Sequence, residues 1–297
     1  MPALAGLIFL IAFLFSISFA PQTFSPQVQS FSTSLNERAI KIENIPNPRL
    51  ASRSAVVFDA DSGQRLFDLN GDEIRPIASL TKLMSALVFL DHNPGWEKSI
   101  TISQEDIRGG SKANIFVGDK IILSDLFTLG LVASDNTAIV ALVRSTGLSE
   151  VAFVKAMNDK AEELRIGSIS FADPTGLDPQ NKGNAVSVVR LVDKAFKQAD
   201  INKALIKTSF EFGVSKTVTR RVKTTNNLLG QKLPGTIVLQ GGKTGHLDEA
   251  GYCFAGVFTL GKKHFITAVL GAPYDENRFS ETLKIIDWTS RAYLWDN

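Results

Sequence analysis

The stretch "RPIASLTKLMSALVFL", from Arg75 to Leu90, decides how the chain is interpreted. Its apolar residues recur at helical spacing and predict a helix with a buried stripe, made of Leu80, Leu83, Met84, Leu87 and Val88. Ser79 and Lys82 lie at the start of this run, where further apolar residues would pack better. Because residues three apart share one face of a helix, the hydroxyl and the amine can meet.

A lysine next to a serine can act as the base that activates the serine hydroxyl. A serine hydroxyl is a poor nucleophile until a base takes its proton, and a lysine is such a base once burial lowers its pKa. However, S-x-x-K also occurs by chance, and Ser79 alone is explained as a helix N-cap after Pro76 with Lys82 in solvent. A catalytic interpretation of Ser79 and Lys82 therefore depends on other motifs.

Two further motifs follow in a fixed order. "VASDNTA" contains Ser134-Asp135-Asn136, and "QGGKTGH" contains Lys243-Thr244-Gly245, although "GGKTG" in isolation would indicate a plain turn. The order S-x-x-K, S-x-N, K-T-G is the set found in penicillin-binding proteins and class A β-lactamases. The predicted context fits, because the first motif opens a helix, the second lies between helical runs, and the third closes a strand.

Composition excludes several classes of function. The 297 residues carry 32 basic and 30 acidic side chains that are interspersed, so we expect no nucleic-acid partner. Cys253 is the single cysteine and is expected to be a small buried residue on a strand. The three histidines, His92, His246 and His264, are too scattered for a metal site. We expect neither a metal nor another cofactor.

The amino terminus predicts export. Residues 2–20 carry no charge and are just long enough to span a bilayer core of roughly 30 Å. Ser18 and Ala20 also fit a signal-peptidase site, whereas Pro21 and the lack of Lys or Arg at the start count against cleavage. We therefore expect residues 1–23 to be a signal peptide or a membrane anchor, followed by a polar linker over 24–50. The protein would act in the periplasm or at the outer face of the cytoplasmic membrane.

The rest of the chain predicts an α+β fold. Residues 54–70 predict a β-hairpin around the turn Asp61-Ser62-Gly63-Gln64, and residues 77–229 are mostly helical in pattern. Strand patterns return from Thr236, and a helix closes the chain. We expect one antiparallel sheet built from both ends of the chain, with the helical middle forming a subdomain, in a catalytic domain over 51–297.

Longer stretches carry a family resemblance: "KTTNNLLG", "GGKTGHLDEAGY" and "VLGAPYDENRFSETLKIIDW". From about Ser54 to Trp295 the chain resembles the low-molecular-mass D-alanyl-D-alanine carboxypeptidases, penicillin-binding proteins of serine peptidase family S11. The resemblance implies a β-lactamase/transpeptidase-like sheet flanked by helices. It also implies removal of the terminal D-Ala from peptidoglycan stem peptides, a place in cell-wall synthesis and cell shape, and covalent inhibition by β-lactam antibiotics.

The resemblance and the chemistry together assign the catalytic roles. Ser79 would be the nucleophile and Lys82 its general base. Ser134 with Lys243 would pass the proton to the leaving amine, and Asn136 would hold the substrate amide in register.

Substrate contacts are assigned to the strand that ends in K-T-G. The oxyanion donors would be the backbone N–H groups of Ser79 and His246, and Gly241, Gly242 and Gly245 would let the substrate lie along the strand edge as an extra strand. Thr244 and Arg278 are the candidates for the terminal carboxylate. Arg278 could equally be a surface residue of the last helix.

Three alternatives use the same motifs. A D,D-endopeptidase would cleave cross-links with the same residues. A class A β-lactamase would need an E-x-x-L-N loop between S-D-N and K-T-G, and no acidic residue of that interval begins one. A non-catalytic wall-binding protein would have lost a motif residue, and all are present. Because the sequence stops at Asn297, we expect no C-terminal β-domain and membrane attachment only through residues 1–20.

Overall fold

The computed structural model describes residues 39–110 and 112–295. The predicted export segment, residues 1–23, and the first part of the predicted linker lie outside the described residues. The described residues belong to one compact unit, Asn36–Asn297.

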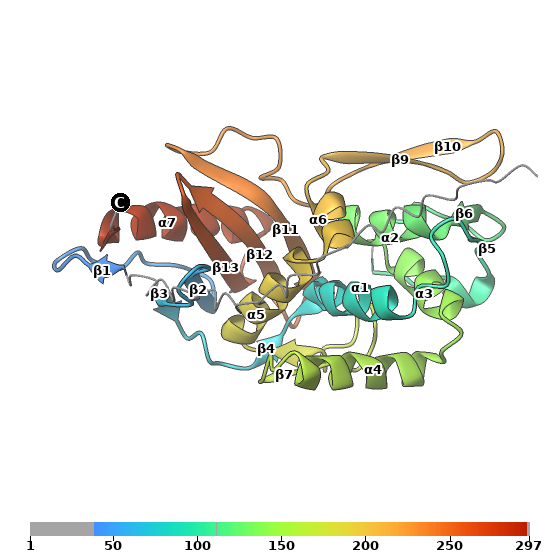
Figure 1. The fold of residues 1–297 in the computed structure, drawn as a ribbon, viewed down its shortest axis with the longest axis horizontal. Helices are drawn as coiled ribbons and strands as arrows, with labels where there is room; N and C mark the ends of the chain where they lie inside the picture. The colour runs from blue at the N-terminus through green and yellow to red at the C-terminus, as the bar shows by residue number, and fades with distance from the viewer. Residues whose placement is uncertain (1–38, 111, 296–297) are drawn as a thin grey trace, which may run out of the picture. The chain divides into compact units, whose positions relative to one another are not determined.

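A five-stranded antiparallel sheet forms the centre of this unit (Figure 1). Its strand order is β11-β12-β13-β2-β3, and the strands are β2 (Ser54–Asp59), β3 (Arg65–Leu69), β11 (Ile237–Leu247), β12 (Gly251–Leu260) and β13 (Lys263–Ala272). β2 pairs with β13 across the middle of the sheet, with Val56 opposite Ala268. The two ends of the chain therefore build one sheet, as predicted.

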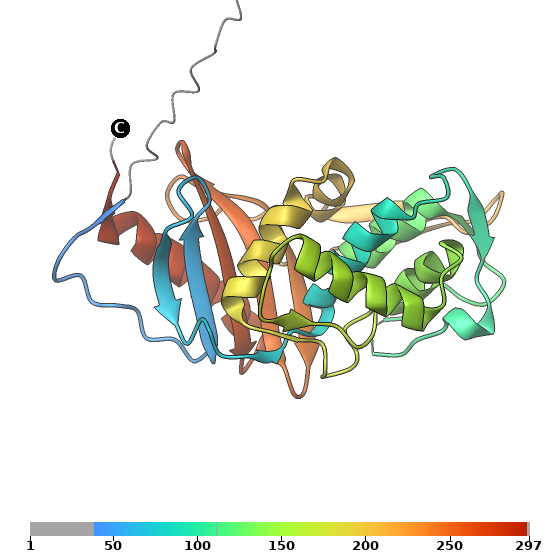
Figure 2. The same cartoon turned by 60° about the horizontal axis from the view of Figure 1, so that its bottom comes forward.

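Helices cover both faces of the sheet (Figure 2). Side chains alternate between the faces of a strand, so Val56 packs with the core around α5 (Ala185–Phe196). Its neighbours Ala55 and Val57 pack with the core around α7 (Asp275–Ala292). Cys253 is buried in β12, which confirms the structural role expected for it. The predicted α+β class with a sheet flanked by helices is confirmed.

The middle of the chain forms a mainly helical subdomain. Its helices are η1 (Ala78–Thr81), α1 (Lys82–Asp91), η2 (Gln104–Asp106), α2 (Leu123–Val132), α3 (Asn136–Ser145), α4 (Glu150–Glu163) and α6 (Ala199–Leu205). Short strands accompany them: β4 (Arg75–Pro76), β5 (Ser99–Thr101), β6 (Lys120–Ile122), β7 (Ile169–Ser170) and β8 (Lys182–Gly183).

A long hairpin interrupts the pattern that was predicted to be mostly helical over residues 77–229. It consists of β9 (Ser209–Gly213) and β10 (Thr219–Lys223), which pair in antiparallel register. Phe210 and Phe212 alternate with polar residues, which is the period of a strand, and their rings stack 5.7 Å apart. Each strand has five residues, so the strand pattern was hidden within a longer run of helical pattern.

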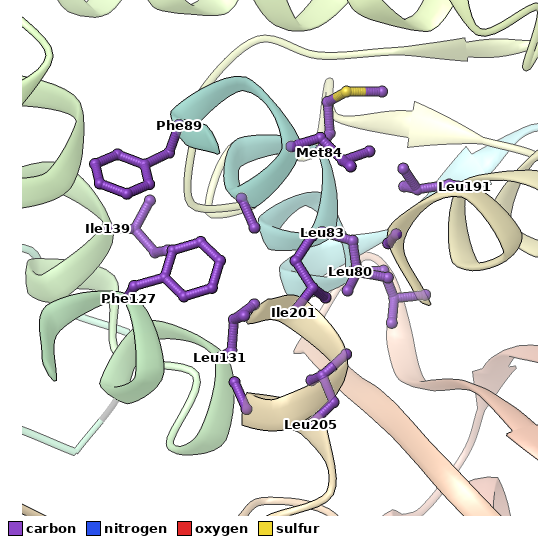
Figure 3. Close-up of a cluster of buried hydrophobic side chains, with 14 of the residues drawn as sticks. Leu80, Leu83, Met84, Phe89, Phe127, Leu131, Ile139, Leu191, Ile201 and Leu205 are labelled. Carbon is purple, nitrogen blue, oxygen red and sulfur yellow. The ribbon is translucent and has the colours of Figure 1, made fainter. Parts of the chain in front are cut away.

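Helix α1 lies inside the subdomain core (Figure 3). Leu80, Leu83 and Met84 are completely buried, so the predicted apolar stripe is confirmed. At the far end of the helix, the ring of Phe89 packs against that of Phe127 on α2, with 5.7 Å between centroids. Packing on all sides fixes the first turn of α1, which carries Lys82.

Residues 39–50, assigned from sequence to the end of the linker, pack on the folded unit. β1 (Ile40–Lys41) pairs with β14 (Tyr293–Leu294) after the last helix. The indole N–H of Trp288 donates to the carbonyl of Pro46 at 2.8 Å. Both contacts join residues more than 200 positions apart, and local composition cannot reveal such pairing.

No single helix in the described part of the chain is long and apolar enough to cross a membrane. Only α3 and α4 taken together reach that length and composition, and they are bent by 94°.

Candidate active site

Three hydrogen bonds bring the residues of the three sequence motifs together. Lys82 Nζ, on the first residue of α1, lies 2.7 Å from Ser79 Oγ on η1. Lys243 Nζ, on β11, lies 2.7 Å from Ser134 Oγ in the α2–α3 connection. Asn136 at the start of α3 links the motifs, because its Oδ1 lies 2.6 Å from Lys82 Nζ. The structure thus gathers the five predicted catalytic residues in one place.

The turn that presents Ser79 has an unusual backbone. Ala78, the residue before it, has φ of 47°, a left-handed conformation that is strained for a residue with a side chain. Strand β11 lies close to this turn at Gly245. A Cβ on Gly245 would lie 3.0 Å from Ile77 O and 3.1 Å from Ser79 N. A side chain here would force the strand or the turn to shift by a few tenths of an ångström, so glycine suits this close approach to the nucleophile.

The S-D-N turn is also held in a strained conformation. Ser134 has φ of 56°. Asp135, the N-cap of α3, accepts a hydrogen bond from Ala138 N at 2.9 Å, and Asn114 donates to its other oxygen at 2.9 Å. These bonds fix the turn, so the Ser134 hydroxyl stays aimed at Lys243.

Burial prepares Lys82 for use as a base. Its side chain is completely buried, and the loss of solvent lowers its pKa to about 7. The negative charges of Asp173 and Asp135 act in the opposite direction and partly offset this effect. A substantial neutral fraction at neutral pH is what a general base requires.

The hydrogen bonds of Lys82 also orient its lone pair. A neutral amine has two N–H donors and one lone pair. The Thr175 carbonyl at 2.5 Å and Asn136 Oδ1 at 2.6 Å are acceptors only. Asn136 Nδ2 donates to the Gly109 carbonyl at 2.6 Å, which fixes the orientation of its amide. In the neutral amine both N–H groups are used in this way, which leaves the lone pair to accept from the Ser79 hydroxyl.

Lys243 is the second buried amine of the site. Burial, together with the positive charges of Lys82 and Arg278, lowers its pKa well below the usual value. It donates to the carbonyl of Thr244 at 2.9 Å in addition to contacting Ser134. A lysine with a lowered pKa next to a hydroxyl is suited to passing a proton along that hydroxyl.

The loop "DPTGLD", residues 173–178, also contributes to the site, although the sequence analysis assigned no role to it. Asp173 Oδ1 accepts from the backbone N–H groups of Thr175 and Gly176, at 2.5 and 2.9 Å. Its Oδ2 accepts from Asp178 N at 2.6 Å. This arrangement holds the Thr175 carbonyl against Lys82. The Asp-Pro-x-Gly pattern signals a tight turn, but nothing in it signals the partner.

Strand β11 lies at one end of the sheet. Its partner is β12, and among residues 39–110 and 112–295 no strand pairs with its other edge. The hydroxyls of Thr244 and Thr225 lie 2.5 Å apart. Thr225 belongs to "KTTNNLLG", which was quoted for the resemblance without a role for this residue. An open edge next to the nucleophile fits the predicted addition of substrate as an extra strand.

Arg278 and His246 lie at the K-T-G end of β11. Arg278 donates from Nη1 to the Gly245 carbonyl at 3.0 Å and forms an ion pair with Asp275. The His246 ring stacks on Tyr252 at 4.0 Å. Arg278 is therefore close to K-T-G and buried, unlike a solvated surface arginine. Its contact with a substrate carboxylate and the oxyanion role of His246 N–H stay predictions.

The sequence profile of the D-alanyl-D-alanine carboxypeptidases, peptidase family S11, matches residues 41–274. The chain belongs to this family. It is 33% identical over 248 residues to a D-alanyl-D-alanine endopeptidase of Pseudomonas aeruginosa, covering 80% of this chain and 77% of that one. It is 27% identical to a D-alanyl-D-alanine carboxypeptidase of Bacillus subtilis, covering 93% and 68%.

A solved structure of another protein shares the fold. Penicillin-binding protein D2 of Listeria monocytogenes, in its cefotaxime-bound form, superimposes with a TM-score of 0.71 at 29% identity. The match covers 83% of this chain and all of that one. The S11 family and the fold that the sequence predicted are therefore both confirmed.

Proposed function

We propose that the protein is a serine-type D-alanyl-D-alanine carboxypeptidase that removes the terminal D-Ala from peptidoglycan stem peptides. The observation that carries this proposal is the geometry of Lys82, a completely buried amine with a pKa lowered to about 7 and 2.7 Å from the Ser79 hydroxyl. Family membership supplies the substrate class.

Acylation follows from the positions of the groups. Ser79 Oγ attacks the carbonyl carbon of the penultimate D-Ala while its proton moves to Lys82 Nζ. The backbone N–H groups of Ser79 and His246 would receive the negative charge of the oxyanion. When the C–N bond breaks, the leaving amine takes a proton from the Ser134 hydroxyl, which Lys243 replenishes. D-Ala leaves, and an ester on Ser79 remains.

Deacylation reverses the proton movements. A water molecule takes the place of the departed amine, passes a proton through Ser134 to Lys243, and attacks the ester. The C–O bond to Ser79 breaks, and the Ser79 oxygen takes back the proton held by Lys82. The shortened peptide leaves with a new terminal carboxylate.

A β-lactam would acylate the same serine. The bond broken in a β-lactam belongs to a ring, so the leaving amine stays attached and remains in the path of water. The ester therefore persists, and the drug inhibits covalently. The cefotaxime-bound form of the Listeria relative supports this expectation.

A second candidate function is cleavage of D-Ala cross-links as a D,D-endopeptidase. Three relatives with this name, from Pseudomonas aeruginosa, Escherichia coli and Haemophilus influenzae, are 28 to 34% identical to the chain. The same catalytic groups serve both reactions. Digestion of a free pentapeptide and of a cross-linked dimer by the purified protein separates them, because an endopeptidase cleaves the dimer faster.

A β-lactamase is disfavoured because the carboxylates near Lys82 are already occupied by hydrogen bonds within the protein. Asp173 and Asp135 are the acids whose charges act on Lys82. Both oxygens of Asp173 accept hydrogen bonds from the backbone of its own loop. The oxygens of Asp135 accept hydrogen bonds from Ala138 and Asn114. Neither is placed to activate a hydrolytic water for rapid release of the drug.

Intact-mass analysis after incubation with penicillin tests the function. We expect one adduct on the wild type and none on Ser79→Ala. Ser280→Ala, which removes an exposed hydroxyl on α7, is the matched control and should label like the wild type. Lack of an adduct on the wild type, or an undiminished adduct on Ser79→Ala, would contradict the assignment.

Export and attachment through residues 1–20 form part of the same proposal. The uncharged stretch over residues 2–20 and the extracytoplasmic location of peptidoglycan support a site in the periplasm or at the outer face of the cytoplasmic membrane. Cell fractionation of the full chain and of a chain beginning at Phe24 tests it. The shortened protein should leave the membrane fraction if it folds, and its retention there would refute the attachment.

A further inference from the structure

The β9–β10 hairpin, which runs along the helical subdomain (Figure 1), carries two adjacent arginines that face in opposite directions. Arg220 lies directly opposite Phe212 in the antiparallel register, and Arg221 lies opposite Glu211. Residues that are opposite each other share one face of a strand pair, and successive residues alternate between the faces. Phe212 is buried in the subdomain core, so Arg220 points toward the body of the protein. Arg221 points into solvent, where it pairs with Glu211.

Arg220 holds the loop that precedes β6. Both terminal nitrogens of its guanidinium contact the carboxylate of Asp119, and Nη2 lies 3.0 Å from Oδ1. Nη1 also donates to the carbonyl of Asn114 at 3.1 Å, and the guanidinium lies over the ring of Phe116, 4.9 Å from its centroid. Asp119 in turn accepts from the backbone N–H of Phe116 at 2.7 Å. One side chain of the hairpin thus fixes both ends of the segment 114–119.

This ion pair is better defined than an ordinary surface pair. The side chain of Asp119 is 12% exposed and that of Arg220 is 30% exposed. Two N–H···O bonds between one guanidinium and one carboxylate fix the geometry of the pair as well as its charge. Ion pairs in full solvent contribute little, whereas this one is partly buried and its guanidinium makes a further hydrogen bond to Asn114. The position of the loop therefore depends on Arg220.

The same loop reaches the S-D-N motif. Asn114 Nδ2 donates to Asp135 Oδ2 at 2.9 Å, while Asp135 Oδ1 accepts from Ala138 N at the start of α3. The preceding residue, Ser134, has the left-handed φ of 56°, and its hydroxyl lies 2.7 Å from Lys243 Nζ. A strained residue keeps its conformation only while the surrounding contacts hold it. The bond from Asn114 is one of the contacts that hold this turn.

We propose that Arg220 is a positioning residue for proton transfer by Ser134, and that it acts through the loop of residues 114–119 and through Asp135. The inference rests on the proposed function, in which the Ser134 hydroxyl gives its proton to the leaving amine. It adds a role in the reaction for the β9–β10 hairpin. Because a misplacement of about 1 Å can cost about 10²-fold in rate, loss of one contact in this series is measurable.

The test compares two substrates that differ in the group that leaves. A D-Ala-D-Ala peptide releases an amine, which must take up a proton as the C–N bond breaks. A thioester with D-thiolactate in place of the last D-Ala keeps the terminal carboxylate and releases a thiolate, a weak base that leaves without a proton. The ratio kcat/KM covers the steps up to acylation, so deacylation does not enter the comparison. Misplacement of Ser134 should therefore slow the peptide and spare the thioester.

We expect Arg220→Gln to lower kcat/KM about 10-fold for the peptide and less than about threefold for the thioester. Arg220→Lys should recover part of the loss, because an ammonium keeps the charge next to Asp119 and lacks the planar fork. Asn114→Ala should show the same selectivity, and the double variant should lose less than the product of the single effects. Arg221→Gln is the matched control, because its ion-pair partner in the described part of the chain is Glu211. It should cleave both substrates like the wild type.

Amide hydrogen exchange gives a readout that does not depend on activity. In Arg220→Gln the amides of residues 114–119 should exchange faster than in the wild type, and so should the amide of Ala138, which donates to Asp135. Arg221→Gln should change neither. Faster exchange in the loop with unchanged exchange at Ala138 would overturn the inference, because the loop would then not act on the turn.

Equal losses on the two substrates, or no loss, in a folded Arg220→Gln would also overturn the inference. If Arg220→Gln does not fold, Arg220→Lys and Asn114→Ala carry the same comparison. Penicillin labelling of Ser79 is measured in parallel. A wild type that labels and releases D-Ala, with variants that lack the selectivity, refutes only the role of Arg220. A wild type that neither labels nor releases D-Ala refutes the proposed function and this inference with it.

Discussion

Replacement of Lys82 by methionine tests the central feature of the site. Methionine keeps most of the length of the side chain and removes the amine. The Ser79 hydroxyl then loses its base, and loss of a general base typically costs ~10²–10⁴-fold in rate. The change also leaves Thr175 O and Asn136 Oδ1 without their donor, at about 1–3 kcal/mol for each unsatisfied buried group. The variant no longer has to bury an amine, and the free energy saved in this way offsets part of that cost.

The pH dependence of acylation gives a second measure of the same group. With a pKa of about 7, about one tenth of Lys82 is neutral at pH 6 and about nine tenths at pH 8. The base acts in its neutral form, so the wild-type acylation rate should rise about tenfold between these values and then level off. A group with a pKa near its usual range would instead give a rate that keeps rising through pH 9.

Stopped-flow acylation by a fluorescent penicillin measures both quantities, and thermal unfolding followed by circular dichroism reports on the fold. Lys155→Met is the matched control, because this lysine is exposed on α4 and its ion-pair partner among residues 39–110 and 112–295 is Asp159 of the same helix. It should acylate like the wild type. A folded Lys82→Met that acylates within a few-fold of the wild type would refute the assignment. The assignment would also be refuted if the acylation rate of Lys82→Met kept the pH midpoint of the wild type.

Three further predictions concern neighbouring groups. Arg278→Ala should lower kcat/KM for a D-Ala-D-Ala peptide about 10- to 150-fold, with little effect on its C-terminal amide; equal losses in the two assays would make Arg278 purely structural. Gly245→Ala should slow acylation by up to about tenfold, because its Cβ would lie 3.0 Å from Ile77 O and the strand or the turn would have to shift by a few tenths of an ångström, whereas Gly213→Ala should not; unchanged labelling would contradict this packing. Asp173→Asn should move the midpoint of the acylation pH profile below about 7, since the charge of Asp173 raises the pKa of Lys82; an upward shift would reverse the sign of that effect.

The sequence predicted the elements whose patterns are local. Alternating residues and a strong turn located the hairpin of β2 and β3, and the apolar spacing after Pro76 located α1. The order of S-x-x-K, S-D-N and K-T-G placed the motifs correctly at a helix start, an interhelical turn and a strand end. Strands β9 and β10 were missed, because five-residue strands are too short to stand out in a helical region.

The sequence by itself determined which chemical groups are present, their order, and the family to which they belong. Only the tertiary structure decided that the three motifs meet, because they are far apart in the sequence and are joined by the contacts of Lys82 with Asn136 and of Lys243 with Ser134. It also decided that a carbonyl of the "DPTGLD" loop holds Lys82, which no residue type encodes since every residue has that carbonyl. The pKa of Lys82 belongs to the fold as well, because it is set by burial, and burial is the sum of contacts from the whole chain.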